Sequence, residues 1–299
     1  MSFRIDLKNF DKSNMLYLKI LILAILQGMC ELLPVSSSAH VIIAERIMGL
    51  DPASPDMTLL LVMLHTGTMF AVIVYFWEIW RQQFFASWQV LRQSLKLIVA
   101  ATVLTGIIGY GLKVAIEKGV LGHIPGAEVE MLFARLDLIA LALAAVGLLI
   151  IVAGRRAALN AHPTIGLKEA TIIGAVQGLC LPFRGFSRSG ATISTGLLLN
   201  IARAQAEAFS FALAVVLTPP VIAREVIRLL RGQEGTPSDP GQLLTLFLPS
   251  MIGMVAAFIA GLLALRWLSS WLEQGRWSFF GYYCLAFAAV VFALYQYGF

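Results

Sequence analysis

Two short polar segments interrupt the apolar stretches of this 299-residue chain, and both carry side chains that can do chemistry. Residues 27–40 contain a carboxylate, three consecutive serines and a histidine. Residues 177–190 contain an arginine between two serines, followed by a glycine. Polar and ionisable side chains at membrane depth are costly, so they indicate a functional site. The two segments lie 150 residues apart and share a Gln-Gly-x-Cys start, which indicates one site built from two related parts.

The first segment begins with two polar side chains that share one face of a helix. Gln27 and Glu31 are four residues apart, the spacing that places side chains side by side on a helix. A carboxylate in this position can hold a divalent cation, accept a proton or form a buried salt bridge with an arginine. Because intramembrane carboxylates are rare, we expect a functional role for Glu31.

A run of serines follows Pro34, where the first helix is expected to end and a second to begin. One serine is enough to cap the second helix, so the run from Ser36 to Ser38 exceeds what capping requires. His40 lies three residues after Ser37, within reach if the second helix starts there. A serine and a histidine are the minimum for an activated oxygen nucleophile, and we expect this pair to act in that way.

The second segment predicts a phosphate site. The stretch from Gly185 to Gly190 is a glycine-bounded turn that opens a helix, and the N–H groups of such a turn bind anions. Arg188 adds a forked cation that suits phosphate oxygens, and its distance from either membrane interface argues against a merely snorkelling side chain. The residues that we expect to contact phosphate are Ser36, Gly185, Ser187, Ser189, Gly190 and Thr192.

The two segments are chemically complementary. The first supplies a carboxylate, hydroxyls and an imidazole, whereas the second supplies a cation and an anion-binding turn. Together they indicate hydrolysis of a phosphate ester or anhydride on a lipid that enters from the membrane.

Composition predicts that a membrane-spanning helical fold positions these segments. The chain is 59% hydrophobic and 13% charged, whereas a soluble domain carries about 25% charge. The apolar runs lack the alternation of a β-barrel, so we expect an all-α polytopic membrane protein. Six stretches are long enough to cross the hydrocarbon layer: 59–77, 95–116, 136–154, 207–228, 245–267 and 278–298.

An offset of 150 residues relates the first three spans to the last three, as it relates the polar segments. We therefore predict a single domain, 1–299, with one repeat at about 16–154 and the other at about 166–299. Each polar segment breaks an apolar stretch into two pieces that we expect to be too short to span. This pattern is typical of a re-entrant hairpin. A hairpin followed by three spans inverts the second repeat, so the hairpins should meet near the midplane.

The distribution of charge gives a weak indication of orientation. On one predicted face lie Arg81, Arg92, Lys96, Arg155, Arg156, Lys168, Arg266 and Arg276. On the other lie Asp51, Asp56, Glu117, Glu128, Glu130, Glu234 and Asp239. The positive-inside rule then places both termini and the mouth of the first hairpin outside. Five residues oppose or weaken this assignment: Arg4, Lys8, Lys12, Arg228 and Arg231.

Other features of the sequence narrow the classes of partner. The net charge of +5 comes without a basic run interleaved with aromatics, so we expect no nucleic-acid partner. Cys30, Cys180 and Cys284 lie in apolar surroundings and are expected to be buried free thiols. Residues 16–33 lack a cleavage pattern, so we expect them to be retained. We assign no role to Glu45, Asp137 or Glu225, and the sequence leaves a homodimer open.

The two segments resemble the motifs of the undecaprenyl-diphosphate phosphatase family of bacterial membrane enzymes. The first family motif, Glu/Gln-x-x-x-Glu followed by Pro-Val-Ser-Ser-x-x-His, matches Gln27, Glu31, Pro34, Val35, Ser36, Ser37 and His40. The second, Pro-Gly-x-Ser-Arg-Ser-Gly-Ala-Thr, matches residues 184–192 except that Arg184 stands in place of the proline. Ala39 also departs from a common glycine, and Gln27 is the weaker of the two permitted first residues.

This resemblance implies removal of the terminal phosphate of undecaprenyl diphosphate in the bacterial inner membrane, and the charge distribution described above places the site on the periplasmic side. It also implies a link to bacitracin resistance and assistance by Mg²⁺ or Ca²⁺. The metal would be held by Glu31 and Gln27, with Ser37 as nucleophile, His40 as base and then as acid or base on the intermediate, and Arg188 stabilising phosphoryl charge. Ser36 or a metal-activated water remains an alternative nucleophile.

Three other functional classes share some of these features. A lipid phosphatase of the Pro-Ser-Gly-His type is disfavoured, because Ser194 and Leu198 stand where that class has its histidine and aspartate. A transporter or flippase for a polyprenyl phosphate lipid remains the main alternative, since inverted repeats with broken helices are a transporter architecture. An ion channel is disfavoured because the ionisable residues cluster in one place.

Overall fold

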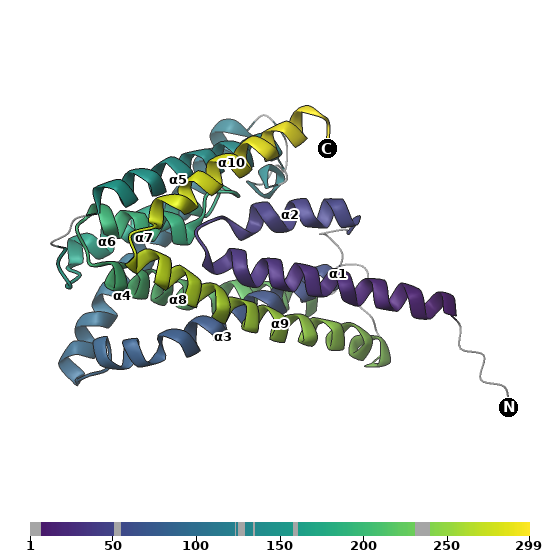
Figure 1. Cartoon of the computed structure of the whole chain (residues 1–299), viewed down its shortest axis with the longest axis horizontal. Coiled ribbons are helices and arrows are strands. Elements are labelled where there is room, and N and C mark those ends of the chain that lie inside the picture. The colour runs from purple at the N-terminus through teal and green to yellow at the C-terminus, as the bar shows by residue number, and fades with distance from the viewer. Residues whose placement is uncertain are drawn as a thin grey trace.

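The computed structural model describes residues 7–50, 55–122, 124, 129–133, 135–157, 161–230 and 240–299, and these ranges form an all-α fold (Figure 1). Several residues used to predict orientation lie outside them: Arg4, Asp51, Glu128, Arg231, Glu234 and Asp239. The side chains of Lys8, Lys12, Asp56, Glu130, Glu225 and Arg228 also lie outside the description.

Ten α-helices are present within the described ranges. They are α1 (Leu7–Leu32), α2 (Ser37–Met48), α3 (Pro55–Gln83), α4 (Trp88–Ala115), α5 (Leu136–Arg156), α6 (Leu167–Cys180), α7 (Arg188–Leu198), α8 (Arg203–Leu230), α9 (Pro240–Glu273) and α10 (Trp277–Gln296). A π-helical turn (Ile116–Val120) extends α4, and a short 3₁₀ helix (Val129–Leu132) precedes α5.

The six expected spans are confirmed as long apolar helices, namely α3, α4, α5, α8, α9 and α10. A seventh helix also has the length and composition to cross a membrane, because Met15–Leu32 of α1 forms an unbroken 18-residue apolar window. The expectation that each piece of the broken segments is too short was therefore wrong for α1. At about 1.5 Å per residue these 18 residues extend about 27 Å, close to the thickness of the hydrocarbon layer.

The breaks in the two polar segments fall where the sequence predicted them. Helix α1 ends at Leu32, before Pro34, and α2 restarts at Ser37. Helix α6 ends at Cys180 and α7 restarts at Arg188. At about 1.5 Å per residue, the 12 residues of α2 extend about 18 Å and α7 is shorter still. Each short helix packs against its partner, and the turn between α1 and α2 points toward α7 (Figure 1).

Small residues allow the polar segments to approach the long helices closely. Helix α1 packs on α9, and a Cβ at Gly28 would lie 2.6 Å from the carbonyl oxygen of Ala257. Helix α6 packs on α4, and a Cβ at Gly178 would lie 2.8 Å from the carbonyl oxygen of Thr105. Both glycines directly follow the glutamines that start the two segments. Close backbone packing therefore holds the start of each polar segment against a long helix.

Buried indole groups anchor the core around the second segment. The Nε1 of Trp277 on α10 donates to the hydroxyl of Ser194 on α7 at 3.0 Å. The Nε1 of Trp80 on α3 donates to the carbonyl oxygen of Ala208 on α8 at 3.1 Å. Large apolar side chains also cover outer faces, as Val99, Val103 and Ile107 do on α4. Exposed apolar surface of this kind suits contact with lipid.

Candidate active site

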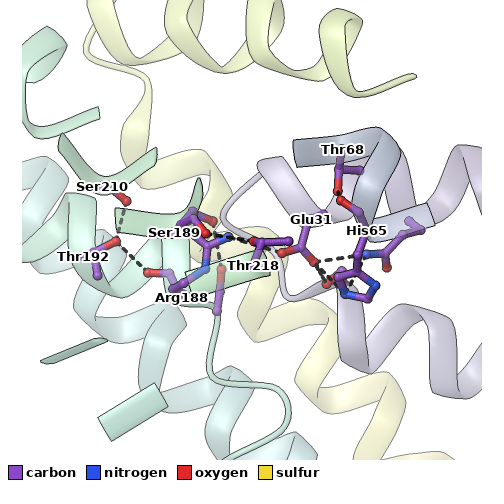
Figure 2. Close-up of polar contacts among 12 residues, drawn as sticks. Glu31, His65, Thr68, Arg188, Ser189, Thr192, Ser210 and Thr218 are labelled. Carbon is purple, nitrogen blue, oxygen red and sulfur yellow. Dashed lines mark hydrogen bonds and ion pairs between the residues drawn. The ribbon is translucent and has the colours of Figure 1, made fainter. Parts of the chain in front are cut away.

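Glu31 is the centre of the polar site and joins residues from both broken segments. Its Oε2 accepts a hydrogen bond from the hydroxyl of Ser37 at 2.6 Å. Its Oε1 accepts one from Nη2 of Arg188 at 3.2 Å, across 157 positions of sequence. Figure 2 shows Glu31 between Arg188 on one side and His65 on the other. The expectation that the two segments meet at one place is borne out by this geometry.

Gln27 and His65 complete the surroundings of the carboxylate. The Nε2 of Gln27 donates to Oε2 of Glu31 at 3.2 Å, as the spacing of four residues predicted. It also lies 3.2 Å from Nε2 of His65, whose Nδ1 lies 2.8 Å from the carbonyl oxygen of Leu61. Since a carbonyl only accepts, Nδ1 of His65 carries the proton and Nε2 accepts from Gln27.

His65 was not identified from the sequence, although it lies 3.9 Å from the Glu31 carboxylate. It sits inside the apolar stretch 59–77, and an ionisable residue within such a span is itself a signal of function. In its neutral form His65 does not neutralise Glu31, so the contact becomes an ion pair only when the ring takes up a proton.

Backbone strain marks the turn between α1 and α2. Ser36 has φ of 66° and ψ of 93°, a region that residues other than glycine rarely occupy. The carbonyl of Ser36 faces Nδ1 of His40 at 2.8 Å, and the Ser36 hydroxyl lies 3.2 Å from that of Ser38. This turn projects Ser37 toward Glu31 and fixes the ring of His40.

Among the hydrogen bonds of the described residues, none joins Ser37 to His40. The Ser37 hydroxyl bonds to Glu31, whereas Nε2 of His40 lies 2.7 Å from the hydroxyl of Tyr283 on α10. Helical side chains lean toward the N-terminus, and the His40 ring therefore lies over the carbonyl of Ser36. Carboxylate and serine, not imidazole and serine, form the close pair.

Hydroxyl groups of the second segment hold its turn together. Ser187 caps α7, since its hydroxyl accepts from the N–H of Gly190 at 3.2 Å. Ser189 donates to the carbonyl oxygen of Leu33 at 3.3 Å and so ties α7 to the end of α1. Thr192 lies 2.6 Å from Ser210 on α8 and also donates to the carbonyl of Arg188. Phosphate binding by these residues stays a prediction.

Gly185 occupies a backbone position that only glycine fills without strain. Its φ is 95°, and a Cβ there would lie 2.6 Å from the carbonyl oxygen of Ile139. Its N–H also donates to the hydroxyl of Ser38 at 3.4 Å, which links the two turns directly. The glycine lets the second turn fit between α5 and the first turn.

Arg188 is held at the site with unused hydrogen-bonding capacity. Its side chain is 20% exposed, and Nη2 is engaged with Glu31. Its Nη1 is buried and has no hydrogen-bond partner in the part of the chain that the structure describes. A buried guanidinium nitrogen normally finds an acceptor, so Nη1 keeps hydrogen-bonding capacity that the described residues do not use.

Two cavities border the site on different sides. One, of about 530 Å³, is lined by polar groups that include Gln27, Ser37, Glu45, His65 and Arg184. The other, of about 660 Å³, is lined by apolar side chains of α1, α9 and α10, with His40 and Tyr283 among its walls. The geometry suits a molecule with a charged head and an apolar body.

The polar cavity is also lined by Glu45, to which the sequence assigned no role, and by Arg184, which departs from the family motif. Glu45 is buried on α2, and its Oε1 has no hydrogen-bond partner among the residues described. Arg184, which stands at the usual proline position, lies 4.7 Å from the centroid of the Phe133 ring and attracts Glu45 electrostatically. Both side chains therefore line the same cavity as Gln27 and Ser37.

Glu31 and Gln27 are the donors that the centre of the site offers to a divalent cation. In the described ranges no group of three or more His, Cys, Asp or Glu side chains is arranged to hold a metal ion. Mg²⁺ commonly binds one or two carboxylates and completes its shell with water and substrate phosphates. Glu31 with its neighbour Gln27 meets that minimum when a diphosphate supplies the remaining oxygens.

Comparison with known proteins finds one family and several relatives that this chain resembles over most of its length. Residues 20–290 match the family described as bacitracin resistance protein BacA. The chain is 57% identical over 278 residues to undecaprenyl-diphosphatase 2 of Acinetobacter baylyi, covering 93% of this chain and 97% of that protein. It is 30% identical over 282 residues to undecaprenyl-diphosphatase of Rhodopirellula baltica, with coverage of 93% and 97%. It is 31% identical over 277 residues to undecaprenyl-diphosphatase of Thermodesulfovibrio yellowstonii, with coverage of 93% and 96%.

Proposed function

The chain belongs to the bacitracin resistance protein BacA family, and on that premise we propose that it hydrolyses undecaprenyl diphosphate to undecaprenyl phosphate and inorganic phosphate. The product is the lipid carrier of cell-wall synthesis, so the reaction recycles that carrier. Within the described ranges, the long apolar helices α3, α4, α5, α8, α9 and α10 support a multi-pass location in the bacterial inner membrane.

One observation carries the assignment of this activity to the broken segments. Glu31 holds the hydroxyl of Ser37 on one oxygen and Arg188 on the other, and Nη1 of Arg188 is buried without a partner. A nucleophile, its proton acceptor and a guanidinium with unused donors thus lie within one set of contacts. Phosphoryl transfer needs these three elements.

The geometry supports a specific order of events. Ser37 Oγ attacks the terminal phosphorus while Glu31 accepts the hydroxyl proton across 2.6 Å. The bond from phosphorus to the bridging oxygen breaks, and its electron pair leaves with the prenyl phosphate. Arg188 stabilises the charge on the transferred phosphoryl oxygens. Water then releases phosphate from Ser37, and His40 acts as acid or base in the steps that follow attack.

A divalent cation is part of this proposal. Glu31 and Gln27 would hold Mg²⁺ or Ca²⁺ against the diphosphate, and the cation would neutralise charge that develops on it. The turn residues Gly185, Ser187, Ser189, Gly190 and Thr192, together with Ser36, would orient the terminal phosphate.

We further propose that α1–α2 and α6–α7 are re-entrant hairpins of an inverted repeat within a single domain. In this repeat α1 corresponds to α6, and α4 corresponds to α9. The packing of α1 on α9 is therefore matched by the packing of α6 on α4, which supports the proposal. The repeat also relates α3 to α8 and α5 to α10, and the two helices of each pair pack against each other. The site would then open to the periplasmic side, as the charge distribution favours.

Phosphate release from purified protein tests the proposed function. Wild-type protein in detergent with Mg²⁺ is expected to release phosphate from undecaprenyl diphosphate, and Ser37→Ala, His40→Ala and Arg188→Ala are expected to lose activity by orders of magnitude while remaining folded. If well-folded wild type releases none, the enzyme assignment fails. Translocation of a polyprenyl phosphate lipid, which the broken helices also suit, then becomes the leading function.

A further inference from the structure

Both ring nitrogens of His40 have fixed partners, and these partners define its proton positions. Nδ1 lies 2.8 Å from the carbonyl oxygen of Ser36, which can only accept, so Nδ1 carries a hydrogen. In the neutral ring the lone pair is therefore on Nε2. That nitrogen lies 2.7 Å from the hydroxyl of Tyr283, which must donate to it.

Stacked aromatic rings hold this arrangement in one orientation. The Phe287 ring lies 4.0 Å from the His40 ring between centroids, with 11° between the planes. The Tyr283 ring is also nearly parallel to it, at 5.7 Å and 9°. Since His40 is buried, its Nε2 cannot turn to another partner without breaking these contacts.

We propose that Tyr283 is a positioning residue for His40 in the hydrolysis of the lipid diphosphate, a role that rests on the proposed function. Neutral His40 accepts the hydrogen of the Tyr283 hydroxyl. When Nε2 takes up a proton, the new N–H donates to the Tyr283 oxygen and the phenolic hydrogen turns away. The same phenol thus stabilises both protonation states without movement of either ring.

The location of the pair suits a role in proton transfer near the lipid. His40 and Tyr283 are neighbours on the wall of the apolar cavity, whereas Ser37 borders the polar cavity. The Ser37 proton has its own acceptor in Glu31 at 2.6 Å. His40 therefore does not need to take the Ser37 proton, and its Nε2 exchanges protons at the Tyr283 hydroxyl on the wall of the apolar cavity.

The neighbouring Tyr282 provides a matched control. Its hydroxyl accepts from Nη2 of Arg155 at 2.9 Å, away from His40. Tyr283→Phe and Tyr282→Phe each remove one hydroxyl from adjacent positions of α10 and keep the ring. Differences between the two variants therefore report the contact with His40 and not a general change in α10.

The test measures kcat and KM for phosphate release and, in the same purified proteins, the ¹⁵N resonances of the His40 ring. Resonances are assigned with a His40→Gln sample. For Tyr283→Phe, kcat is expected to fall about tenfold with KM unchanged, less than the roughly 10²- to 10⁴-fold effect of an acid–base group itself. The Nε2 resonance is expected to move toward that of a nitrogen without a hydrogen-bond donor, and Tyr282→Phe is expected to match wild type in every measurement.

Three results would overturn the proposal. An unmoved Nε2 resonance in Tyr283→Phe would show that the phenol does not bond to His40. A moved resonance with kcat within twofold of wild type would show a contact without a role in the reaction. A rise in KM with unchanged kcat would assign Tyr283 to lipid binding. Absence of phosphate release by wild type would refute the proposed function separately, because the resonances do not depend on turnover.

Discussion

The substitution Glu31→Gln gives the sharpest prediction about the reaction. Glu31 accepts hydrogen bonds from Ser37, Arg188 and Gln27. Glutamine keeps the length of the side chain and one acceptor oxygen, so most of the packing is preserved. It cannot accept the Ser37 proton, however, and it does not attract a divalent cation as a carboxylate does.

The expected loss follows from these two missing functions. Removal of a group that accepts a proton in the transition state costs about 10²- to 10⁴-fold, and we expect kcat/KM to fall about 10³-fold. This corresponds to about 4 kcal/mol of lost transition-state stabilisation. The effect on folding should be smaller than for a fully buried ion pair, because Glu31 and Arg188 each keep 20% side-chain exposure.

The assay is phosphate release from undecaprenyl diphosphate over a range of Mg²⁺ concentrations. If Glu31 only holds the metal, high Mg²⁺ should restore the activity of the variant; if it also accepts the Ser37 proton, the loss should persist at saturation. Glu78→Gln is the matched control, since Glu78 is an exposed carboxylate on α3 that bonds to Arg81. Activity of Glu31→Gln within threefold of wild type at every Mg²⁺ concentration would refute the reasoning.

Three further predictions concern the turn, the polar cavity and the metal. Gly185→Ala should lower the free energy of unfolding by about 2–4 kcal/mol, because of its φ of 95° and the nearby Ile139 carbonyl, as measured by denaturation in detergent. Gly106→Ala, with open space around its Cβ, should not, and equal effects would contradict the argument. Arg184→Ala should raise KM about three- to tenfold with little change in kcat, as for a lost binding contact, whereas Arg135→Ala, which loses only its pair with Asp137, should change neither. EDTA should abolish phosphate release and Mg²⁺ or Ca²⁺ should restore it; full activity in EDTA would remove the metal from the account.

The sequence was sufficient to locate the helices and the breaks because both depend on local composition. Apolar runs of span length became α3, α4, α5, α8, α9 and α10. Pro34 and the glycine-bounded turn at residue 185 stopped the helices where backbone chemistry requires it. The spanning length of α1 was underestimated because its apolar run of 18 residues lies close to the minimum needed to cross the hydrocarbon layer.

Contacts between distant helices could not be predicted in the same way. His65 reaches Glu31 only because α3 turns that face toward α1, and rotation about a helix axis is set by packing. Tyr282 and Tyr283 are adjacent in sequence, yet only Tyr283 faces His40. The spacing of Ser37 and His40 is helical, as the sequence predicted. Their side chains nevertheless point in different directions and bond to different partners.

The central claim is that both broken segments form one catalytic site, and a double-mutant comparison tests it most directly. Phosphate release from undecaprenyl diphosphate is measured for wild type, Ser37→Ala, Arg188→Ala and the double variant, each checked for folding. Residues that act as a unit show strongly non-additive losses, so the double variant should be about as inactive as Ser37→Ala alone. Losses that multiply would contradict a shared site, because they would mean that Ser37 and Arg188 act independently.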